Sequence, residues 1–175
     1  MKRRRWIGAA SVIALTLILI TVRSLDAPLF LYPSSASLPA GLYMRSFEPV
    51  RTGTIAAFSA PKAAQRYQET AVAQMPSDHL FLKPIAAGPG DLVCNSLEKG
   101  LEVNNVWIAP VAKADSYGRL LPIWRLCRQL HQDEFFTFSN FAPNSPDSRY
   151  YGPVQVDNLP ATYRRISLCV WLCQS

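Results

Sequence analysis

The sequence predicts a mainly β fold, in which a single N-terminal membrane-anchor helix precedes a domain of short antiparallel strands. The chain has 175 residues and is 49% hydrophobic, which suffices for one domain core and one membrane segment. Its fourteen prolines and few long periodic runs favour a loop-rich β domain over a helical bundle. Trp6–Val22 is an uncharged run of apolar and small residues, at the lower limit of length for a membrane span.

The net charge of +6 comes mostly from the N-terminal tip. Lys2–Arg5 supply four of the eighteen basic residues, and the other fourteen nearly balance the twelve acidic ones. Basic residues ahead of an apolar segment keep the N-terminus in the cytoplasm, so the remainder is expected outside the inner membrane. The basic and aromatic residues form no stripe typical of nucleic-acid binders, and no nucleic-acid partner is expected.

We therefore divide the chain into residues 1–23, a cytoplasmic tip and membrane anchor, and residues 24–175, an extracytoplasmic domain. Arg23 follows the apolar run at once, and no small-x-small cleavage site stands out between Thr21 and Leu31. This favours an uncleaved anchor in the bacterial inner membrane over a signal peptide that is removed. In the second case the domain would be free in the periplasm.

The elements of the domain follow from alternating apolar residues and turn signals. Strands are predicted at 41–45, 54–58, 80–87, 92–95, 101–103, 106–108, 135–139, 154–156 and 166–172. Gly88-Pro89-Gly90-Asp91 is a strong turn signal, and Asn104-Asn105 predicts a hairpin. A modest amphipathic helix is predicted from Ser59 to Gln74.

The four cysteines fit an oxidising compartment. They allow three pairings, of which we predict Cys94–Cys127, because these residues flank the Asn104-Asn105 hairpin. The pairing of Cys169 and Cys173 is left open. Zinc is the alternative, but there is no Cys-x-x-Cys pair and the two histidines lack ligand spacing, so we expect neither metal nor cofactor.

Ser37 is the first candidate catalytic residue. It lies in Ser34–Gly41, a turn of small residues that leads into a predicted strand. Such a turn can expose the hydroxyl and leave backbone N–H groups free to bind an oxyanion, to which Ser35 could add its own hydroxyl. A plain polar turn is the more common explanation of such a cluster.

Lys83 is the second candidate, because it interrupts the apolar run Leu80–Ala87. With strand alternation, Phe81, Lys83 and Ile85 share one face, so the ammonium lies among apolar groups. A lysine acts as a base only when such surroundings desolvate its ammonium and favour the neutral amine. A serine acts as a nucleophile only when a neighbouring base takes its proton. The alternative is an edge strand that uses an inward lysine and Pro84 against aggregation.

The third candidate segment is Asn144–Gly152. Asp147 and Arg149 are close enough in sequence to form an ion pair, and Ser145 and Ser148 could hydrogen-bond to a nearby base. An Asx-type surface turn is the alternative, although such a turn would not need the adjoining arginine and tyrosines.

Taken in order, these segments resemble the signal peptidase I family of membrane-bound Ser–Lys endopeptidases. Four stretches carry the resemblance: Ser35–Pro39 for the nucleophile box, Gly53–Phe58 for the following strand, Leu82–Asp91 for the lysine box and Asn144–Gly152 for the Asp-Ser-Arg box. Ser37–Tyr43 and Asp115–Pro122 are similar to the small conjugative-transfer peptidases of the TraF type. Thr54, Pro84 and Pro146 depart from the usual family residues.

The resemblance implies a signal peptidase I type of β domain, with Ser37 as nucleophile, Lys83 as general base and Ser35 as oxyanion donor. It implies that Asp147, with Ser145 and Arg149, organises the site around the lysine. The implied function is the processing of exported precursor proteins at the membrane, with pilin maturation in conjugative transfer or type IV secretion as the leading hypothesis. Secretion-apparatus proteins would be further partners. The alternatives are a general signal peptidase and a non-catalytic envelope assembly protein.

Overall fold

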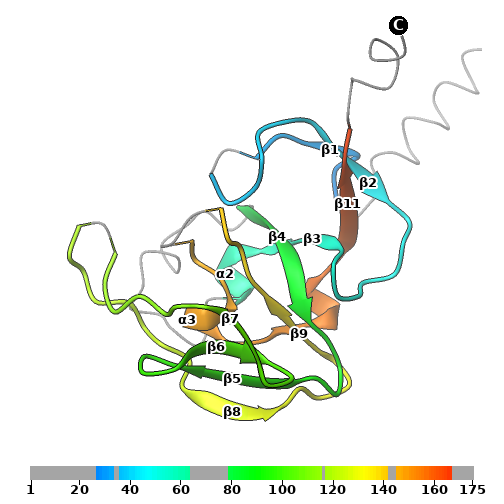
Figure 1. Ribbon diagram of the computed structural model, residues 1–175. Coiled ribbons are helices and arrows are strands. Elements are labelled where there is room, and N and C mark those ends of the chain that lie inside the picture. The colour runs from blue at the N-terminus through cyan, green and yellow to red at the C-terminus, as the bar shows by residue number, and fades with distance from the viewer. Residues whose placement is uncertain (1–26, 34–35, 64–78, 116, 142–144, 167–175) are drawn as a thin grey trace, which may run out of the picture.

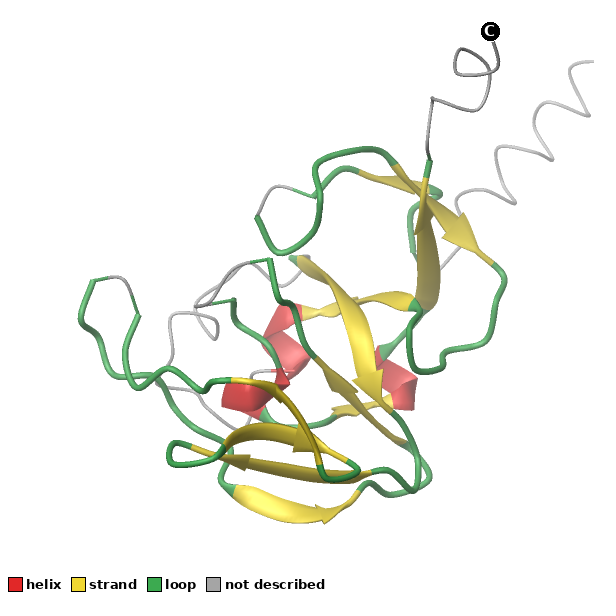
Figure 2. Cartoon of the chain, in the orientation of Figure 1, coloured by secondary structure: helices red, strands yellow, loops and turns green. Residues whose placement is uncertain are grey.

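The computed structural model describes residues 27–33, 36–63, 79–115, 117–141 and 145–166, which form two antiparallel β sheets. Figure 1 and Figure 2 show the smaller sheet below the larger one, with the short helices α2 and α3 beside them. The prediction of a mainly antiparallel β domain is confirmed. The predicted anchor at residues 6–22 lies outside the described residues, and no helix within them has the length and apolar character needed to span a bilayer.

The larger sheet has seven strands in the order β1-β2-β11-β3-β4-β9-β10. Their bounds are Phe30–Leu31 (β1), Tyr43–Ser46 (β2), Ile55–Ser59 (β3), Leu80–Ala87 (β4), Glu134–Thr137 (β9), Val154–Gln155 (β10) and Ala161–Arg165 (β11). The last strand in the chain, β11, pairs with β2 on one side and with β3 on the other. Strand β2 follows Ser37, and strand β4 carries Lys83. The sheet connects these two strands through β11 and β3.

The smaller sheet has four strands in the order β7-β6-β5-β8. They are Leu92–Ser96 (β5), Gly100–Val103 (β6), Val106–Ala109 (β7) and Leu126–Gln129 (β8). Asn104 and Asn105 both have positive φ, 51° and 64°, as a two-residue type I′ turn requires. The predicted hairpin is confirmed. Cys94 lies opposite Cys127 on β5 and β8, and the two form the predicted disulfide.

Strand β4 lies inside the larger sheet, between β3 and β9. The edge-strand explanation of Lys83 is therefore wrong. Pro84 cannot donate a backbone hydrogen bond, and the ladder between β4 and β9 is irregular just beyond it, between Ile85 and Ala87. The face of β4 that carries Phe81 and Ile85 packs into an aromatic and aliphatic core with Phe58 and Tyr151.

The helices of the described part of the chain are short. They are α2 (Ala60–Ala63), α3 (Ser148–Tyr151) and the 3-10 turn η2 (Val156–Asn158). The predicted helix of residues 59–74 begins as α2 at Ala60, and its continuation after Ala63 lies outside the described residues.

The last predicted strand, 166–172, is the least accurate of the strand predictions. The structure has its final strand at Ala161–Arg165, and Ile166 already lies beyond it, while 167–175 are outside the described residues. The sequence prediction also omitted β1 and β8. Both are short, and β8 is exposed along most of its length, so neither has the clear apolar alternation that marks a buried strand.

Candidate active site

Ser37 lies on the loop before β2 and is only 4% exposed. The next residue, Leu38, packs with Leu82 in an apolar cluster on the other side of the sheet. Tyr43 donates a hydrogen bond from its hydroxyl to the Pro39 carbonyl at 2.9 Å. Ser139 donates from its own hydroxyl to the carbonyl of Ser37. These contacts fix the loop from both ends, so the Ser37 hydroxyl has a defined position.

Lys83, on β4, is 1% exposed and its Nζ lies 2.6 Å from the Ser37 Oγ. The same Nζ lies 2.5 Å from the Oγ of Ser145, and the two serine oxygens are 3.0 Å apart. The three polar atoms thus form a closed triangle of hydrogen bonds. The structure brings together three of the side chains that the sequence singled out, from segments 46 and 62 residues distant from Lys83.

A neutral lysine fits this triangle. Its amine has one lone pair and two N–H donors, so it can accept from the Ser37 hydroxyl and donate to Ser145. Ser145 can then donate its hydroxyl proton to the Ser37 oxygen. Each of the three groups donates one hydrogen bond and accepts one in this arrangement, and the second N–H of the amine is not part of the triangle.

Burial lowers the pKa of Lys83 from 10.5 to about 8. The cause is desolvation, since the ammonium has lost its water and lies 5.4 Å from the centre of the Phe81 ring. The negative charge of Asp147 raises the pKa, and the positive charge of Arg149 lowers it. Lys83 is therefore close to the range in which a lysine can exchange a proton near neutral pH.

Asp147 and Arg149 form a fully buried ion pair next to this triangle. The guanidinium binds the carboxylate through two hydrogen bonds, Nε to Oδ1 at 2.8 Å and Nη2 to Oδ2 at 2.9 Å. The backbone N–H groups of Arg149 and Ser139 donate to the same two oxygens. The predicted pairing is confirmed, and the surface-turn alternative is wrong because Asp147 has no exposed area.

The carboxylate of Asp147 receives only N–H donors, which is the pattern of an ionised group. Burial raises the pKa of Asp147, and Arg149 opposes this effect through its hydrogen bonds and its charge. Arg149 is held in turn by the Pro110 carbonyl at 2.9 Å and lies 4.8 Å from the centre of the Phe138 ring. The pair thus places one fixed negative charge and one fixed positive charge beside the lysine.

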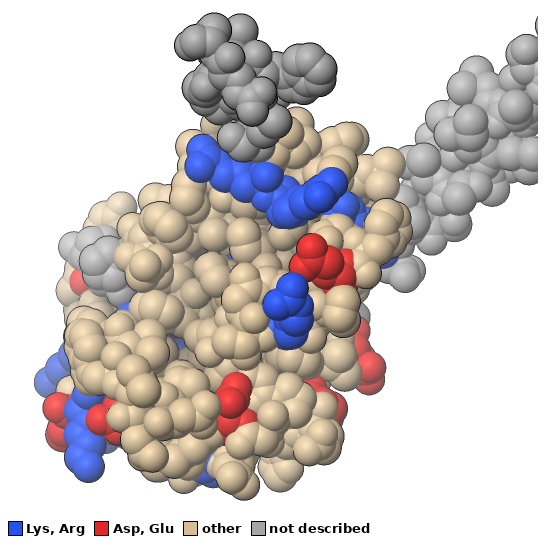
Figure 3. All heavy atoms as spheres, turned by 45° about the vertical axis from the view of Figure 1, so that its right-hand side comes forward, with Lys and Arg blue, Asp and Glu red and all other residues tan. Residues whose placement is uncertain are grey.

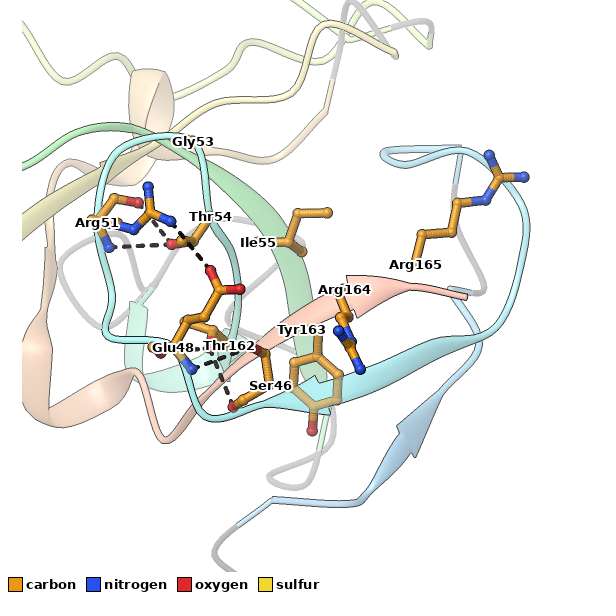
Figure 4. Close-up of a pocket in the computed structure, with 10 residues that line it drawn as sticks. All are labelled: Ser46, Glu48, Arg51, Gly53, Thr54, Ile55, Thr162, Tyr163, Arg164 and Arg165. Atoms are coloured by element: carbon orange, nitrogen blue, oxygen red, sulfur yellow. Dashed lines mark hydrogen bonds and ion pairs between the residues drawn. The ribbon is translucent and has the colours of Figure 1, made fainter. Parts of the chain in front are cut away.

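Ser37 and Lys83 open onto a cleft of about 270 Å³. One wall is the chain at 31–33 and the other is the start of β4, from His79 to Lys83; Pro146 completes the lining. The walls are mainly apolar, so an extended peptide chain can enter and exclude water from the triangle. A larger hollow of about 340 Å³ beside β2 and β11 contains none of the candidate catalytic residues (Figure 4).

This geometry agrees with a comparison of the sequence with protein families. The family described as signal peptidase, peptidase S26, matches residues 3–170, nearly the whole chain. The chain belongs to the signal peptidase S26 family. It is therefore a serine endopeptidase, as the Ser–Lys resemblance predicted.

The chain is also similar to two individual proteins. The plasmid transfer protein TraF of Escherichia coli is 29% identical over 142 residues, which cover 76% of this chain and 80% of TraF. A crystal structure of a signal peptidase I from Enterococcus faecalis is similar with a TM-score of 0.41 and 18% identity. That comparison covers 67% of this chain and 98% of the other.

Not every predicted residue of this S26 site is placed at the triangle. Ser35 lies outside the described residues, and its role as an oxyanion donor stays a prediction. Ser148 does not reach Lys83; its hydroxyl accepts from the Thr137 backbone N–H at 2.9 Å. Of the residues that depart from the family pattern, Pro146 lines the cleft and Thr54 hydrogen-bonds to the Arg51 carbonyl at 2.7 Å.

Two buried residues that the sequence analysis missed hold the site in place. Ser139 links the Ser37 carbonyl to the Asp147 carboxylate. Asn95, on β5 of the smaller sheet, donates to the carbonyls of Trp124 at 2.7 Å and Arg149 at 2.9 Å. The sequence did contain a signal for Asn95. In the strand Leu92–Ser96 it lies two residues after Val93, and so on the strand face where another apolar residue is expected.

Proposed function

We propose that the protein is a membrane-associated serine endopeptidase that uses Ser37 as nucleophile and Lys83 as general base to process exported precursor proteins. The observation that carries the proposal is the buried triangle of Ser37, Lys83 and Ser145 at the inner end of an apolar cleft. The favoured substrate is a pilin precursor in conjugative transfer. The similarity to the plasmid transfer protein TraF supports this choice.

In the first half of the reaction, the Ser37 Oγ attacks the carbonyl carbon of the scissile peptide bond. Its proton passes over 2.6 Å to the neutral Lys83 amine, which becomes an ammonium. The ammonium then gives this proton to the leaving nitrogen as the C–N bond breaks. The products of this half are an ester between Ser37 and the acyl part of the substrate, and a free amine.

In the second half, a nucleophile cleaves the ester. Water attacks the ester carbonyl, Lys83 accepts one proton of the water, and the same proton returns to the Ser37 Oγ as the C–O bond breaks. An amine of the substrate could replace water, and the product would then be a new peptide bond. Either route restores the neutral lysine and the serine hydroxyl, so the proton balance is closed.

The neighbouring residues have supporting roles in this proposal. Ser145 accepts a hydrogen bond from Lys83 and orients the lone pair of the amine toward Ser37. Asp147 stabilises the ammonium that forms during the reaction, and Arg149 holds the carboxylate in place with two hydrogen bonds. Ser35 would donate to the oxyanion.

The surface near the candidate site suits a location at the membrane. Exposed aromatic and aliphatic side chains occur around β1 and β2, including Phe30, Tyr32, Leu42 and Phe47. Figure 3 shows a row of basic side chains across the upper part of one face, and β11 contributes the exposed Arg164 and Arg165. Apolar side chains next to arginines match the interface of an anionic bilayer. This supports a location of the domain beside a membrane.

The test is a comparison of two substrates. The full chain in detergent micelles is incubated with a pilin precursor and with an ordinary preprotein that carries an N-terminal signal, and the products are mapped by mass spectrometry. A cut in the pilin precursor alone supports the conjugative role, and a cut at the signal peptide of the preprotein supports a general signal peptidase. Ser37→Ala serves as the control. Cleavage that persists in Ser37→Ala would contradict the assigned nucleophile.

A further inference from the structure

The cleft contains a polar side chain that the proposed mechanism does not use. Its described lining includes Ser37 and Lys83, which are hydrogen-bonded to each other. The rest of both walls consists mainly of apolar side chains. Besides the exposed Tyr32, the remaining polar side chain is His79. Apolar walls with one convergent polar group are typical of a site that selects one kind of ligand group.

His79 has a fixed place at the far end of the cleft. Its backbone carbonyl accepts a hydrogen bond from the Ala60 N–H at 3.0 Å. Its ring lies edge-on to the Phe81 ring, with 5.9 Å between the centres and an angle of 89° between the planes. Phe81 thus separates His79 from Lys83 along the strand. Within the described part of the structure, the imidazole makes no hydrogen bond or ion pair.

The charges around the cleft favour a negative ligand at this position. No carboxylate belongs to the described lining of the cleft. The nearby Asp147 is already saturated by donors from Arg149 and Ser139. An acidic side chain beside His79 would gain an N–H donor and would meet no carboxylate of the described lining, whereas a lysine or arginine would find no carboxylate partner there.

We propose that His79 forms a subsite that binds an acidic side chain of the substrate. The inference deepens the proposed function and rests on it. A strand rises about 3.3 Å per residue, so the four steps from Lys83 to His79 span about 13 Å. An extended substrate has the same rise, and the acidic residue therefore lies about four residues from the scissile bond.

The test uses a series of quenched fluorescent peptides of about twelve residues, enough to cover the cleft on both sides of the scissile bond. In each peptide one position carries Glu, Gln, Ala or Lys, and kcat/KM is measured with the full chain. We expect kcat/KM to be about tenfold higher for Glu than for Lys at one position, about four residues from the cut. A flat profile across all positions would overturn the proposal.

Variants identify the residue responsible. In His79→Phe the Glu-to-Lys ratio should fall to within about twofold, and in His79→Gln it should fall partly, because an amide keeps an N–H donor but places it differently from the imidazole ring. His131→Phe is the matched control, since it removes the other histidine, which is exposed and not part of the described cleft lining. The ratio of kcat/KM for the Glu peptide to kcat/KM for the Lys peptide is measured with one enzyme preparation, so it does not depend on how much of that enzyme is folded. An unchanged ratio in His79→Phe would contradict the assignment.

A binding measurement separates this inference from the proposed function. Fluorescence anisotropy of the same peptides with Ser37→Ala requires no hydrolysis. If Ser37→Ala binds the Glu peptide selectively and Ser37→Ala/His79→Phe does not, the result supports the subsite. This holds even if the parent protein cleaves none of the peptides, because that failure would count against the proposed function alone. Cleavage by the parent without any effect of His79 on selectivity would overturn the subsite alone.

Discussion

The two sheets of the molecule differ in what they bury. The larger sheet and its loops enclose charged and polar side chains, with Lys83, Asp147 and Arg149 almost fully inaccessible. In the described strands of the smaller sheet, the fully buried side chains are apolar apart from Asn95, and a disulfide joins two of its strands. Buried charges cost stability, whereas apolar packing and a cross-link contribute it. The comparison indicates that the larger sheet is specialised for chemistry and the smaller one supports it.

The largest effect that tests this comparison is expected at the Ser37–Lys83 pair. Ser37→Ala and Lys83→Arg should each reduce kcat on the order of 10⁴-fold or more, since a guanidinium stays protonated at every usable pH. The double variant should be no worse than either single one, because the two residues act as one unit. The measurement is cleavage kinetics together with thermal unfolding. Substantial activity in Lys83→Arg would refute the lysine-base mechanism.

The buried ion pair should show the next largest effect. Asp147→Asn leaves the Arg149 guanidinium buried without a negative partner, so the free energy of unfolding should fall by about 3–5 kcal/mol. Activity should fall less than in Ser37→Ala, because in the proposed mechanism Asp147 orients and stabilises the lysine but transfers no proton. Chemical denaturation and kcat/KM report the two quantities. The exposed pair of Arg51 and Glu48 is the control, and Glu48→Gln should change stability little.

The disulfide of the smaller sheet should affect stability far more than chemistry. Its cysteines are 33 residues apart in the sequence, so Cys94→Ala/Cys127→Ala should lower the free energy of unfolding by about 3–4 kcal/mol in the chain-entropy model. Under conditions where the variant is still folded, kcat should stay close to that of the parent. If kcat fell as far as in Asp147→Asn, the division of roles between the sheets would be wrong.

The pH dependence should also distinguish the two sheets. In the proposed mechanism the neutral amine of Lys83 is the active form. Because the pKa of Lys83 is lowered to about 8, kcat/KM should rise with pH and level off above that value. At pH 6 the neutral fraction, and with it the rate, should be on the order of 1% of the plateau. The disulfide double variant should have the same profile. A rate that does not change between pH 6 and 9 would argue against Lys83 as the base.

The smallest expected effect concerns the contact between the sheets. Asn95→Ala removes two hydrogen bonds to buried carbonyl oxygens and should lower the free energy of unfolding by about 1–3 kcal/mol. Because one of these carbonyls belongs to Arg149, kcat should fall by a modest factor as well. Asn105→Ala changes an exposed turn residue without such contacts, and in that variant kcat should be unaffected.

The sequence was most informative where one residue violated a strong pattern. Lys83 in an apolar strand and the Asp-Ser-Arg segment predicted two parts of the site, and the structure brings Ser37, Lys83 and Ser145 into contact. Strand β4 was predicted with its observed bounds because alternation and the Gly-Pro-Gly-Asp turn define both ends. The Asn104-Asn105 turn and the disulfide followed from local spacing in the same way.

The sequence could not show features that depend on contacts between distant segments. Ser139 has its role only because the loops that carry Ser37 and Asp147 meet beside it. The interior position of β4 depends on pairing with β9, about fifty residues later, and Pro84 suggested the opposite. The exposed strand β8 has little apolar alternation, since its place is fixed by the disulfide and by pairing with β5 rather than by burial.

The place of β11 has a consequence for when the enzyme can become active. Within the described fold, β2 reaches β3 and β4 only through β11, which is made last. Ser37 precedes β2 and Lys83 lies on β4, so the two halves of the triangle are on opposite sides of the final strand. A nascent chain that still lacks β11 has no strand pairing that connects β2 to β3, so only loop and side-chain contacts such as that of Leu38 with Leu82 hold the serine near the lysine. The order of synthesis thus delays assembly of the Ser37–Lys83 pair until nearly all of the described domain has been made.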